Sequence, residues 1–472
     1  MRREGAPSGR RTAGRSPFRR GCGCGMVPAG KGGGFLAGAA DSPGGLRTFR
    51  SEMRRRMTTT QRSMLPAPGP ARGVVAPGFE PVAARFARHL ERGEEIGASL
   101  AVYHRGECVV DVWGGLADEE SGRAWERDTR IVMFSVTKAM AAMALHLLAA
   151  RGQLDFDAPV AKYWPGFGQA GKERMTVRTL VNHQGGLAAL DEAISLADCV
   201  TPSQAARVLD VLERQRPNWP PGEGQGYHAT TYGLYVDELF RRIAGESVGT
   251  FLERELLGPL GSDVRIGTSA ALDGKMATLK ATSTPKRLAA MMRAAAEEPE
   301  SPEGRIARDF LRPTSLARKA LTRPTLGKEG VGEYNGIAVR RACLSWASGT
   351  ASAQGVARAF LPFALGGEVD GRRYFEAETL DPIRRRQGWS WRDAVLQKPI
   401  GWSQGFMKEE RHVFCPNAAS FGHSGLGGAL GWCDPTTGVT MGYVMNRLDW
   451  RIRSPRAMRL CQALWNCEPL LG

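Results

Sequence analysis

A serine and a lysine three residues apart, Ser135 and Lys138, are the residues whose types and spacing most directly allow chemistry. Residues at this spacing share one face of a helix, so the lysine amine can reach the serine hydroxyl. A short apolar segment, 131–134, comes before them and an Ala- and Leu-rich run, 139–150, follows, which predicts a helix that begins at Ser135. The N–H groups of a first helical turn favour developing negative charge. The pair could therefore supply a nucleophile, a proton acceptor and part of an oxyanion site.

The same S-x-x-K spacing occurs a second time, at Ser283 and Lys286. There, Pro285 in the first turn and a polar, Ala-rich helix over 287–298 explain the serine as a helix N-cap without any chemistry. An N-cap role would also explain Ser135, so the spacing alone does not separate the two matches.

Two further segments favour Ser135. A Gly- and Pro-rich turn, 221–226, places Tyr227 just before an apolar helix, where its phenol can reach a cleft. Glycines crowd the segment 421–432, and a turn at 434–438 leads into a second strand, 439–445. This pattern predicts a hairpin with room for a ligand against its backbone.

In this order and at these large separations, the three segments resemble the motifs of the serine β-lactamase and penicillin-binding-protein superfamily: S-x-x-K, then a tyrosine motif, then K-T-G or its histidine variant. Within the superfamily, the chain is most similar to the class C-like branch that holds carboxylesterases of β-lactamase fold. That branch also has a helix that ends in a His-x-x-Gly-Leu turn, as at 176–187 here. The resemblance covers residues 75–467.

The resemblance implies a serine hydrolase that forms an acyl-enzyme on a small-molecule ester or amide, most simply a carboxylesterase for short-chain esters. Ser135 would attack the carbonyl, and Lys138 and Tyr227 would share the proton transfer, with the choice of base between them open. A β-lactamase, a D-Ala peptidase or an acyltransferase of the same fold is the alternative. A non-catalytic binding or assembly module is an alternative of another class, against which the intact triad counts.

By the same resemblance, the backbone N–H groups of Ser135 and Leu426 would hold the oxyanion. Gly425 belongs to the same substrate-binding segment, and His423 would lie on the rim of the cleft, where it orients the substrate or supports Tyr227. The family's lysine is replaced by His423, and Ala229 replaces the polar third residue of the tyrosine motif. Both departures favour esters over β-lactams or peptides.

A competing nucleophile is Ser403, because 401–405 spells the G-x-S-x-G elbow of α/β-hydrolases. An elbow needs a strand before it and a helix after it. Here Pro399 interrupts the preceding run and 406–411 lacks an apolar face, so we expect no elbow.

The remaining histidines are expected to be structural. His183 is predicted to be a helix C-cap residue that interacts favourably with the helix dipole, and His228 to fill the cleft wall. The sequence contains no H-x-x-H, H-E-x-x-H or paired C-x-x-C pattern, so no metal and no cofactor are expected.

The expected fold is α/β (α+β) of the β-lactamase/DD-peptidase type: a central antiparallel sheet flanked by helices, with an inserted, mainly helical lobe. The sheet lobe would comprise residues 75–155 and 340–472, within a catalytic domain of 64–472, and the helical lobe residues 156–335. Individual helices are predicted at 81–92, 157–163, 176–183, 203–215, 230–244, 284–298 and 455–464, and strands at 97–104, 108–114 and after 400.

Positive charge is concentrated at the N-terminus. Residues 1–63 hold fourteen Lys or Arg and three acidic residues, so they carry +11 of the net +16. The catalytic part is then nearly balanced, which argues against a nucleic-acid partner, and no apolar run is long enough to span a membrane. The oligomeric state stays open.

The segment 1–63 is rich in Gly, Arg, Ser and Pro and is expected to be disordered. A translation start at Met57 or Met64 explains it most simply; a transit peptide or a functional basic arm is the alternative. Nine scattered cysteines, mostly beside apolar residues, favour free thiols in a reducing compartment. The expected location is cytoplasmic, or an organelle matrix if the segment is a transit peptide.

Overall fold

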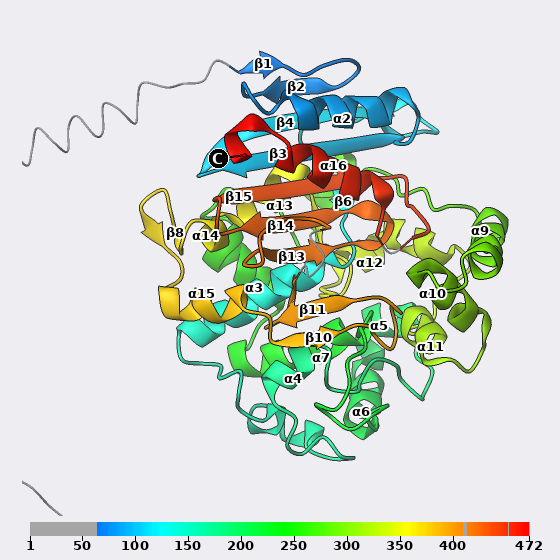
Figure 1. Ribbon diagram of the computed structural model, residues 1–472. Coiled ribbons are helices and arrows are strands. Elements are labelled where there is room, and N and C mark those ends of the chain that lie inside the picture. Colours follow the sequence, from blue (N-terminus) through cyan, green and yellow to red (C-terminus); the bar gives the residue numbers. More distant parts are fainter. Residues whose placement is uncertain (1–63, 409–412, 452, 472) are drawn as a thin grey trace, which may run out of the picture. The chain divides into compact units, whose positions relative to one another are not determined.

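A large antiparallel sheet forms the centre of the computed structural model, which describes residues 64–408, 413–451 and 453–471 (Figure 1). From edge to edge its strands are β1 (Leu65–Pro66), β2 (Arg72–Val75), β4 (Glu107–Asp118), β3 (Gly97–His104), β15 (Val439–Met445), β14 (Leu430–Asp434), β13 (Phe421–Ser424), β12 (Phe406–Lys408), β11 (Ile400–Ser403) and β10 (Gly388–Ser390). β5 (Arg123–Ala124) pairs with β4. The early hairpin β3–β4 joins the late strands where β3 pairs with β15.

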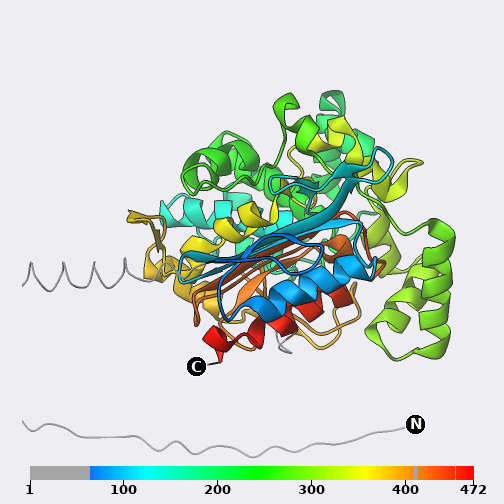
Figure 2. The same cartoon turned by 90° about the horizontal axis from the view of Figure 1, so that it is seen from above.

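Helices cover both faces of the sheet, and this explains why β3 and β15 are buried along nearly their whole length. α2 (Glu80–Glu91) and α16 (Pro455–Trp465) lie side by side on one face (Figure 2). α3 (Val136–Ala150), α13 (Ala353–Ala359) and α14 (Leu361–Ala364) lie on the other.

Two glycines let the helices of the second face approach the sheet closely. Gly431 and Gly442 are partners in the β14–β15 register. A Cβ on Gly442 would lie 2.1 Å from the Ala353 carbonyl oxygen, and one on Gly431 would meet Val136 of α3 at 3.0 Å. The prediction that these glycines leave room for a ligand is therefore wrong at both positions, because α3 and α13 fill the space.

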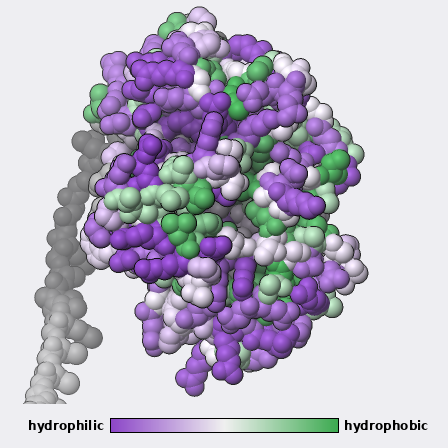
Figure 3. Space-filling model, turned by 90° about the vertical axis from the view of Figure 1, so that its right-hand side faces the viewer, coloured by the Kyte–Doolittle hydropathy of each residue, from purple (hydrophilic) through white to green (hydrophobic). Residues whose placement is uncertain are grey.

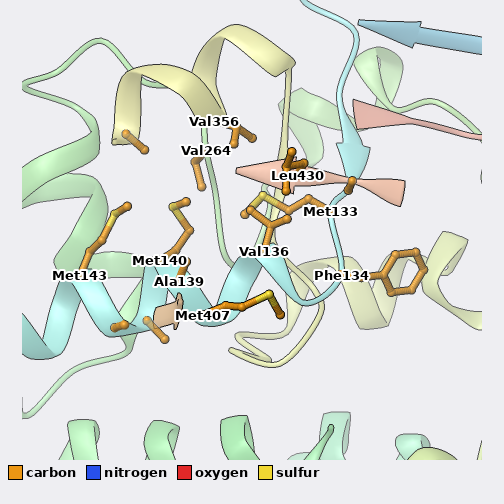
Figure 4. Packing of buried hydrophobic residues seen from close by; sticks show 14 of the residues in the cluster. Met133, Phe134, Val136, Ala139, Met140, Met143, Val264, Val356, Met407 and Leu430 are labelled. Carbon is orange, nitrogen blue, oxygen red and sulfur yellow. The ribbon is translucent and has the colours of Figure 1, made fainter. Parts of the chain in front are cut away.

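α3 is mostly apolar and is buried from Val136 to Leu148, with Lys138 and His146 included, as expected of a central helix. Met140 and Met143 point from it toward the residues drawn around them in Figure 4, among them Val264 and Val356. The helix thus lies between the sheet and the helical lobe. Packing against both holds the helix, and with it the residues at its N-terminus, in place.

The helical lobe and its connections contain short helices. Those between α3 and α13 are α4 (Val177–Val181), α5 (Leu196–Val200), α6 (Ala205–Arg214), α7 (Thr231–Ala244), α8 (Val248–Leu252), the π-helix η4 (Glu253–Leu257), α9 (Thr284–Glu297), α10 (Pro302–Leu311), α11 (Leu316–Thr322) and α12 (Ile337–Arg341). The 3₁₀ turns are η1 (Val160–Lys162), η2 (Pro165–Phe167), η3 (Pro202–Gln204), η5 (Ala270–Lys275), η6 (Gly330–Asn335), η7 (Leu426–Gly428) and η8 (Glu468–Leu470). α15 (Ala377–Arg384) and the strand pairs β6 (Ile131–Val132) with β7 (Thr350–Ala351) and β8 (Glu368–Val369) with β9 (Arg372–Arg373) complete the fold.

The predicted fold class is confirmed, and three local predictions need correction. The helix expected at 157–163 is only the 3₁₀ turn η1, because Pro159 and Pro165 leave no room for an α-helix between them. The segment 421–432 is not one strand: η7 interrupts it, with Gly427 and Gly428 at φ 84° and 131°. The sheet also begins its last meander earlier than expected, at β10.

Seven cysteines lie in the described part of the chain, and all seven are free thiols, as predicted for these positions. Cys22 and Cys24 lie outside the described residues, as do all predictions for 1–63. No described helix is long and apolar enough to cross a membrane.

Candidate active site

Ser135 occupies the N-cap position of α3, as the sequence predicts. It is half-buried, whereas the residues on both sides of it, 131–134 and 136–140, are buried. Phe134 has a left-handed backbone conformation, with φ 46°, which a phenylalanine rarely adopts. Such conformations persist where the surroundings impose them, and here the Phe134 ring packs edge-on against Tyr334 at 5.2 Å. The turn thereby presents the Ser135 hydroxyl at the end of a buried helix.

Lys138 is completely buried, and its Nζ lies 3.0 Å from Ser135 Oγ. Its other two partners are the backbone carbonyl oxygens of Ala229, at 2.7 Å, and Trp346, at 3.1 Å. Burial lowers the pKa of Lys138 well below its usual value. A neutral amine has two N–H groups and one lone pair. The two carbonyls can accept the two N–H groups, which leaves the lone pair for the Ser135 O–H group to donate to.

Tyr227 lies beside Lys138 and Ser135. Its phenol is close enough to Ser135 for the serine to lower the pKa of the phenol, against the larger effect of burial. Its ring is stacked on Trp402 at a centroid distance of 5.7 Å and an angle of 7°. Lys138 Nζ is 5.0 Å from the centre of the same ring. Burial raises the pKa of Tyr227 above its usual value, so the phenol is neutral at neutral pH. Ser135, Lys138 and Tyr227 are thus in mutual contact.

The predicted oxyanion segment lies against the turn that carries the nucleophile. A Cβ on Gly425 would be 2.4 Å from the Met133 carbonyl oxygen, so only glycine allows this approach. Leu426 follows as the first residue of η7, where a helical turn leaves its N–H without an internal partner. Its side chain is 37% exposed, so the segment reaches the molecular surface. The Ser135 and Leu426 amides therefore belong to two adjoining turns.

His423 is completely buried, and the prediction that it lies on the rim of the cleft is wrong. β13 is covered on both faces, and the His423 ring packs 6.0 Å from that of Tyr227 and 5.7 Å from that of Trp402. Its Nδ1–H donates to the Ser424 carbonyl oxygen at 2.7 Å, and Nε2 has no hydrogen-bond partner among the described residues. Burial and then the nearby Lys138 lower the pKa of His423 to about 3, so the ring is neutral.

His183 and His228 are structural, but His183 acts differently from the prediction. The C-cap of α4 is Asn182, and His183 follows it in a left-handed conformation, completely buried. Burial lowers its pKa, so it is not a cation that interacts with the helix dipole. Its Nδ1 accepts a hydrogen bond from the His228 N–H, and His228 Nε2 in turn accepts one from the Leu187 N–H at 2.9 Å. The pair ties the backbone directly after Tyr227 to the turn after α4.

Neither competing serine has catalytic surroundings. Ser403 lies at the end of β11 and is followed by the tight β11–β12 turn, so no helix follows it. It is buried and donates to the Pro382 carbonyl oxygen at 3.1 Å. Ser283 and Lys286 are exposed at the start of α9.

Sequence reasoning missed two groups of the site that come from distant segments of the chain, the Trp346 carbonyl and the Trp402 ring. The carbonyl of Trp346 carries no signal in a sequence, because any residue could supply it. Trp402 was visible only as part of the rejected elbow motif, although a large aromatic beside a tyrosine motif is a natural stacking partner.

Among the described residues, no group of His, Cys, Asp or Glu could hold a metal ion. The face that carries α9 to α11 is hollowed near its centre, and hydrophobic residues border the hollow (Figure 3).

Known proteins are similar to this chain in sequence and in fold. A family model described as beta-lactamase matches residues 82–463. The esterase/beta-lactamase LipL of Mycobacterium tuberculosis is 33% identical over 389 residues, which are 80% of this chain and 83% of LipL. Esterase EstB of Burkholderia gladioli is 31% identical over 193 residues, 37% of this chain and 48% of EstB. The crystal structure of a family VIII carboxylesterase matches with 32% identity and a TM-score of 0.73, over 84% of this chain and 99% of that one. A penicillin-binding-protein homologue from Caulobacter crescentus matches with 32% identity, a TM-score of 0.71 and the same coverage.

Proposed function

The chain belongs to the beta-lactamase family and is a serine hydrolase, and we propose that it is a carboxylesterase that forms an acyl-enzyme on Ser135. The surroundings of Lys138 carry this proposal. A completely buried lysine with two carbonyl acceptors keeps a lone pair directed at the serine hydroxyl 3.0 Å away. A nucleophile with a base in hydrogen-bond contact is the arrangement that covalent hydrolysis needs.

In the first half of the reaction, Ser135 Oγ attacks the ester carbonyl carbon while its proton passes to Lys138 Nζ. The oxyanion that forms accepts hydrogen bonds from the N–H groups of Ser135 and Leu426. When the intermediate collapses, the bond to the alcohol breaks, and the proton reaches the leaving oxygen through the phenol of the neighbouring Tyr227. In the second half, water attacks the acyl-serine, the same groups carry its proton back to Ser135 Oγ, and the carboxylic acid leaves.

The preferred substrates are uncharged, short-chain esters. Relatives with lysine at the third motif offer a permanent cation to the carboxylate of a β-lactam or a peptide end. At that position this chain has His423, which is neutral and buried. Loss of one charge-assisted hydrogen bond costs about 1.5–3 kcal/mol, or about 10- to 100-fold in affinity. Ala229 also offers no side-chain partner to an acylamide.

β-Lactam hydrolysis is the second candidate, because the printed name of LipL joins esterase and beta-lactamase. The two candidates share the chemistry at Ser135 and differ only in what holds the rest of the substrate. A comparison of substrates therefore separates them.

The experiment first asks whether Ser135 is acylated: a fluorophosphonate should add one adduct to the wild-type chain and none to Ser135→Ala. The kcat/KM of p-nitrophenyl butyrate is then compared with that of nitrocefin at pH 7. We expect clear ester turnover and feeble nitrocefin hydrolysis. A folded wild type without an adduct would favour the binding-module alternative. A higher kcat/KM for nitrocefin than for the ester would make the protein a β-lactamase.

A further inference from the structure

A buried carboxyl group that no motif includes holds the backbone of Tyr227. Asp393 lies in the loop between β10 and β11 and is completely buried. Its Oδ1 accepts three backbone hydrogen bonds: from Tyr227 N–H at 3.0 Å, and from Val395 and Leu396 N–H at 2.9 Å each. Two of these bonds shape the Asp393 loop itself. The third joins that loop to a residue 166 positions away in the chain.

The same region of the chain holds Tyr227 at several other points. The Ala394 N–H donates to the Gln225 carbonyl oxygen, and Gln225 Nε2 donates to the Ile400 carbonyl oxygen, both at 3.0 Å. The Tyr227 ring stacks on Trp402 of β11. The backbone and the ring of Tyr227 are thus both held by the segment 393–402, and its hydroxyl group is the part that acts with Ser135 in the proposed reaction.

Two buried oxygens near this contact lack hydrogen-bond donors. Asp393 Oδ2 and Gln225 Oε1 have no partner among the described residues, although the Gln225 side chain approaches the Asp393 carboxyl. Burial raises the pKa of Asp393 to about 6, against the opposing effect of its N–H donors. A proton on Oδ2 would turn one of the two acceptors into a donor for the other. An amide at position 393 would do the same permanently.

We propose that Asp393 is a positioning residue for the esterase reaction: its Oδ1 fixes the Tyr227 backbone and thereby places the phenol at Ser135. This proposal rests on the proposed function, because it assigns Tyr227 a part in proton transfer. Asp393 touches no reacting atom. A displacement of about 1 Å at a proton-transfer group can cost about 100-fold in rate, so a carboxyl that sets the position of Tyr227 controls the rate of the step without taking part in it.

The test is a double-mutant cycle on kcat for p-nitrophenyl butyrate, with Asp393→Ala, Tyr227→Phe and both together. Asp393→Ala should lower kcat by at least 30-fold and change KM by less than threefold, because it leaves the substrate-binding segment at 425–426 intact. If Asp393 acts through Tyr227, its substitution should lower kcat by less than threefold further in the Tyr227→Phe background. If Asp393→Ala does not fold, Asp393→Ser replaces it, since a serine hydroxyl is too short to reach the Tyr227 N–H.

Asp393→Asn tests the chemistry of the anchor. The amide keeps the Oδ1 acceptor and can donate to Gln225 Oε1, so kcat should stay within fivefold of the wild type. A matched control is Asp434→Ala, which removes another buried carboxyl that accepts a backbone N–H, that of Thr436, in the β14–β15 turn. It should lower the melting temperature but leave kcat within threefold at a temperature where it is folded.

Multiplicative losses in the cycle, a kcat of Asp393→Ala within threefold of the wild type, or an equal loss in Asp393→Asn and Asp393→Ala would each overturn the proposal. Failure of the proposed function looks different, since the wild type itself would then show no ester turnover and no adduct on Ser135.

Discussion

In the part of the chain that the structure describes, two lysines are completely buried, and both amines donate to a pair of backbone carbonyl oxygens. Lys138 of α3 donates to two backbone carbonyl oxygens and lies 5.0 Å from a tyrosine ring. Lys172, in the loop after η2, donates to the carbonyl oxygens of Glu213 and Gln215 at 2.8 and 2.7 Å and lies 5.3 Å from a phenylalanine ring. The two sites differ in what else each amine can reach.

Lys172 has acidic neighbours. Burial lowers its pKa to about 8, while the charges of Glu173 and Glu213 counteract this effect. At neutral pH it remains an ammonium that links its loop to the end of α6. Lys138 has a serine hydroxyl in place of an acid, and only burial acts on its pKa. Burial thus makes Lys138, which has no acidic neighbour, a neutral amine that can act as a base. Lys172 is also buried, but its acidic neighbours keep it charged, and its role is structural.

The largest effect is predicted for an experiment that replaces each of the two buried lysines, one at a time, by methionine, an apolar side chain of similar length. Lys138→Met should lower kcat for p-nitrophenyl butyrate by on the order of 10³ or more, because the proton of Ser135 then has no acceptor. Ser135→Ala and Tyr227→Phe should cost similarly, and double variants little more, because the three residues act as one unit. Steady-state kinetics on folded protein measures this.

Lys172→Met is the matched variant of that experiment. It should keep kcat within a few-fold but lower the free energy of unfolding by roughly 2–4 kcal/mol, since two carbonyls lose a charged donor. Thermal and denaturant unfolding give this quantity. A catalytic loss in Lys172→Met as large as that in Lys138→Met would erase the distinction between the two lysines.

The pH dependence should separate the same two residues. Activity needs the neutral amine of Lys138, so kcat/KM should rise with pH through the lowered pKa of this residue, well below 10.5. His423, with its pKa lowered to about 3, adds no inflection near 6.5. The Lys172→Met variant should show the same rise of kcat/KM with pH as the wild type. If the rise disappeared in this variant, Lys172 and not Lys138 would be the group that titrates.

Stability should respond to Lys172 in a different pH window. Its pKa is about 8 in the folded chain and about 10.4 in the unfolded chain. Between these values the unfolded chain binds more protons, so this residue makes stability rise with pH across the window. The rise should be smaller in Lys172→Met, as measured by denaturant unfolding at pH 8 and pH 10.

The contrast between the lysines also shows what a sequence can predict. Ser135 and Lys138 were found because both lie on one helix turn, where spacing along the chain equals proximity in space. Tyr227 was found through its order among known motifs. The carbonyl of Trp346, the stack on Trp402 and the burial of His423 depend on contacts between distant segments, which no local pattern encodes.

For the fold, too, features set by local sequence were predicted correctly, and features set by contacts between distant segments were not. The strand Val439–Met445 and the helix Pro455–Trp465 match their predicted limits within one residue, because alternation, proline and capping are local signals. The glycines of β14 and β15 were misinterpreted for a tertiary reason: their missing side chains make room for α13 and α3 and not for a ligand.

A smaller effect is expected at the elbow-like motif. Ser403→Ala removes one buried hydrogen bond, to the Pro382 carbonyl oxygen, which costs about 1 kcal/mol of stability. Because Ser403 lies in a hairpin and contacts no member of the triad, kcat should stay within a few-fold. Loss of turnover in Ser403→Ala, with activity retained in Ser135→Ala, would reverse the assignment of the nucleophile.

The smallest effect is expected at the second S-x-x-K match, which has the spacing of the first and none of its burial. Ser283 and Lys286 are exposed at the start of α9, and the Ser283 side chain makes no capping hydrogen bond. Both side chains are exposed to solvent, whereas Lys138 is completely buried. Ser283→Ala and Lys286→Met should therefore change the free energy of unfolding by less than about 0.5 kcal/mol and leave kcat/KM for p-nitrophenyl butyrate unchanged. A loss of more than tenfold in kcat/KM at constant Tm in either variant would contradict this prediction. It would mean that the S-x-x-K spacing suffices for catalysis and that burial of the lysine is not required.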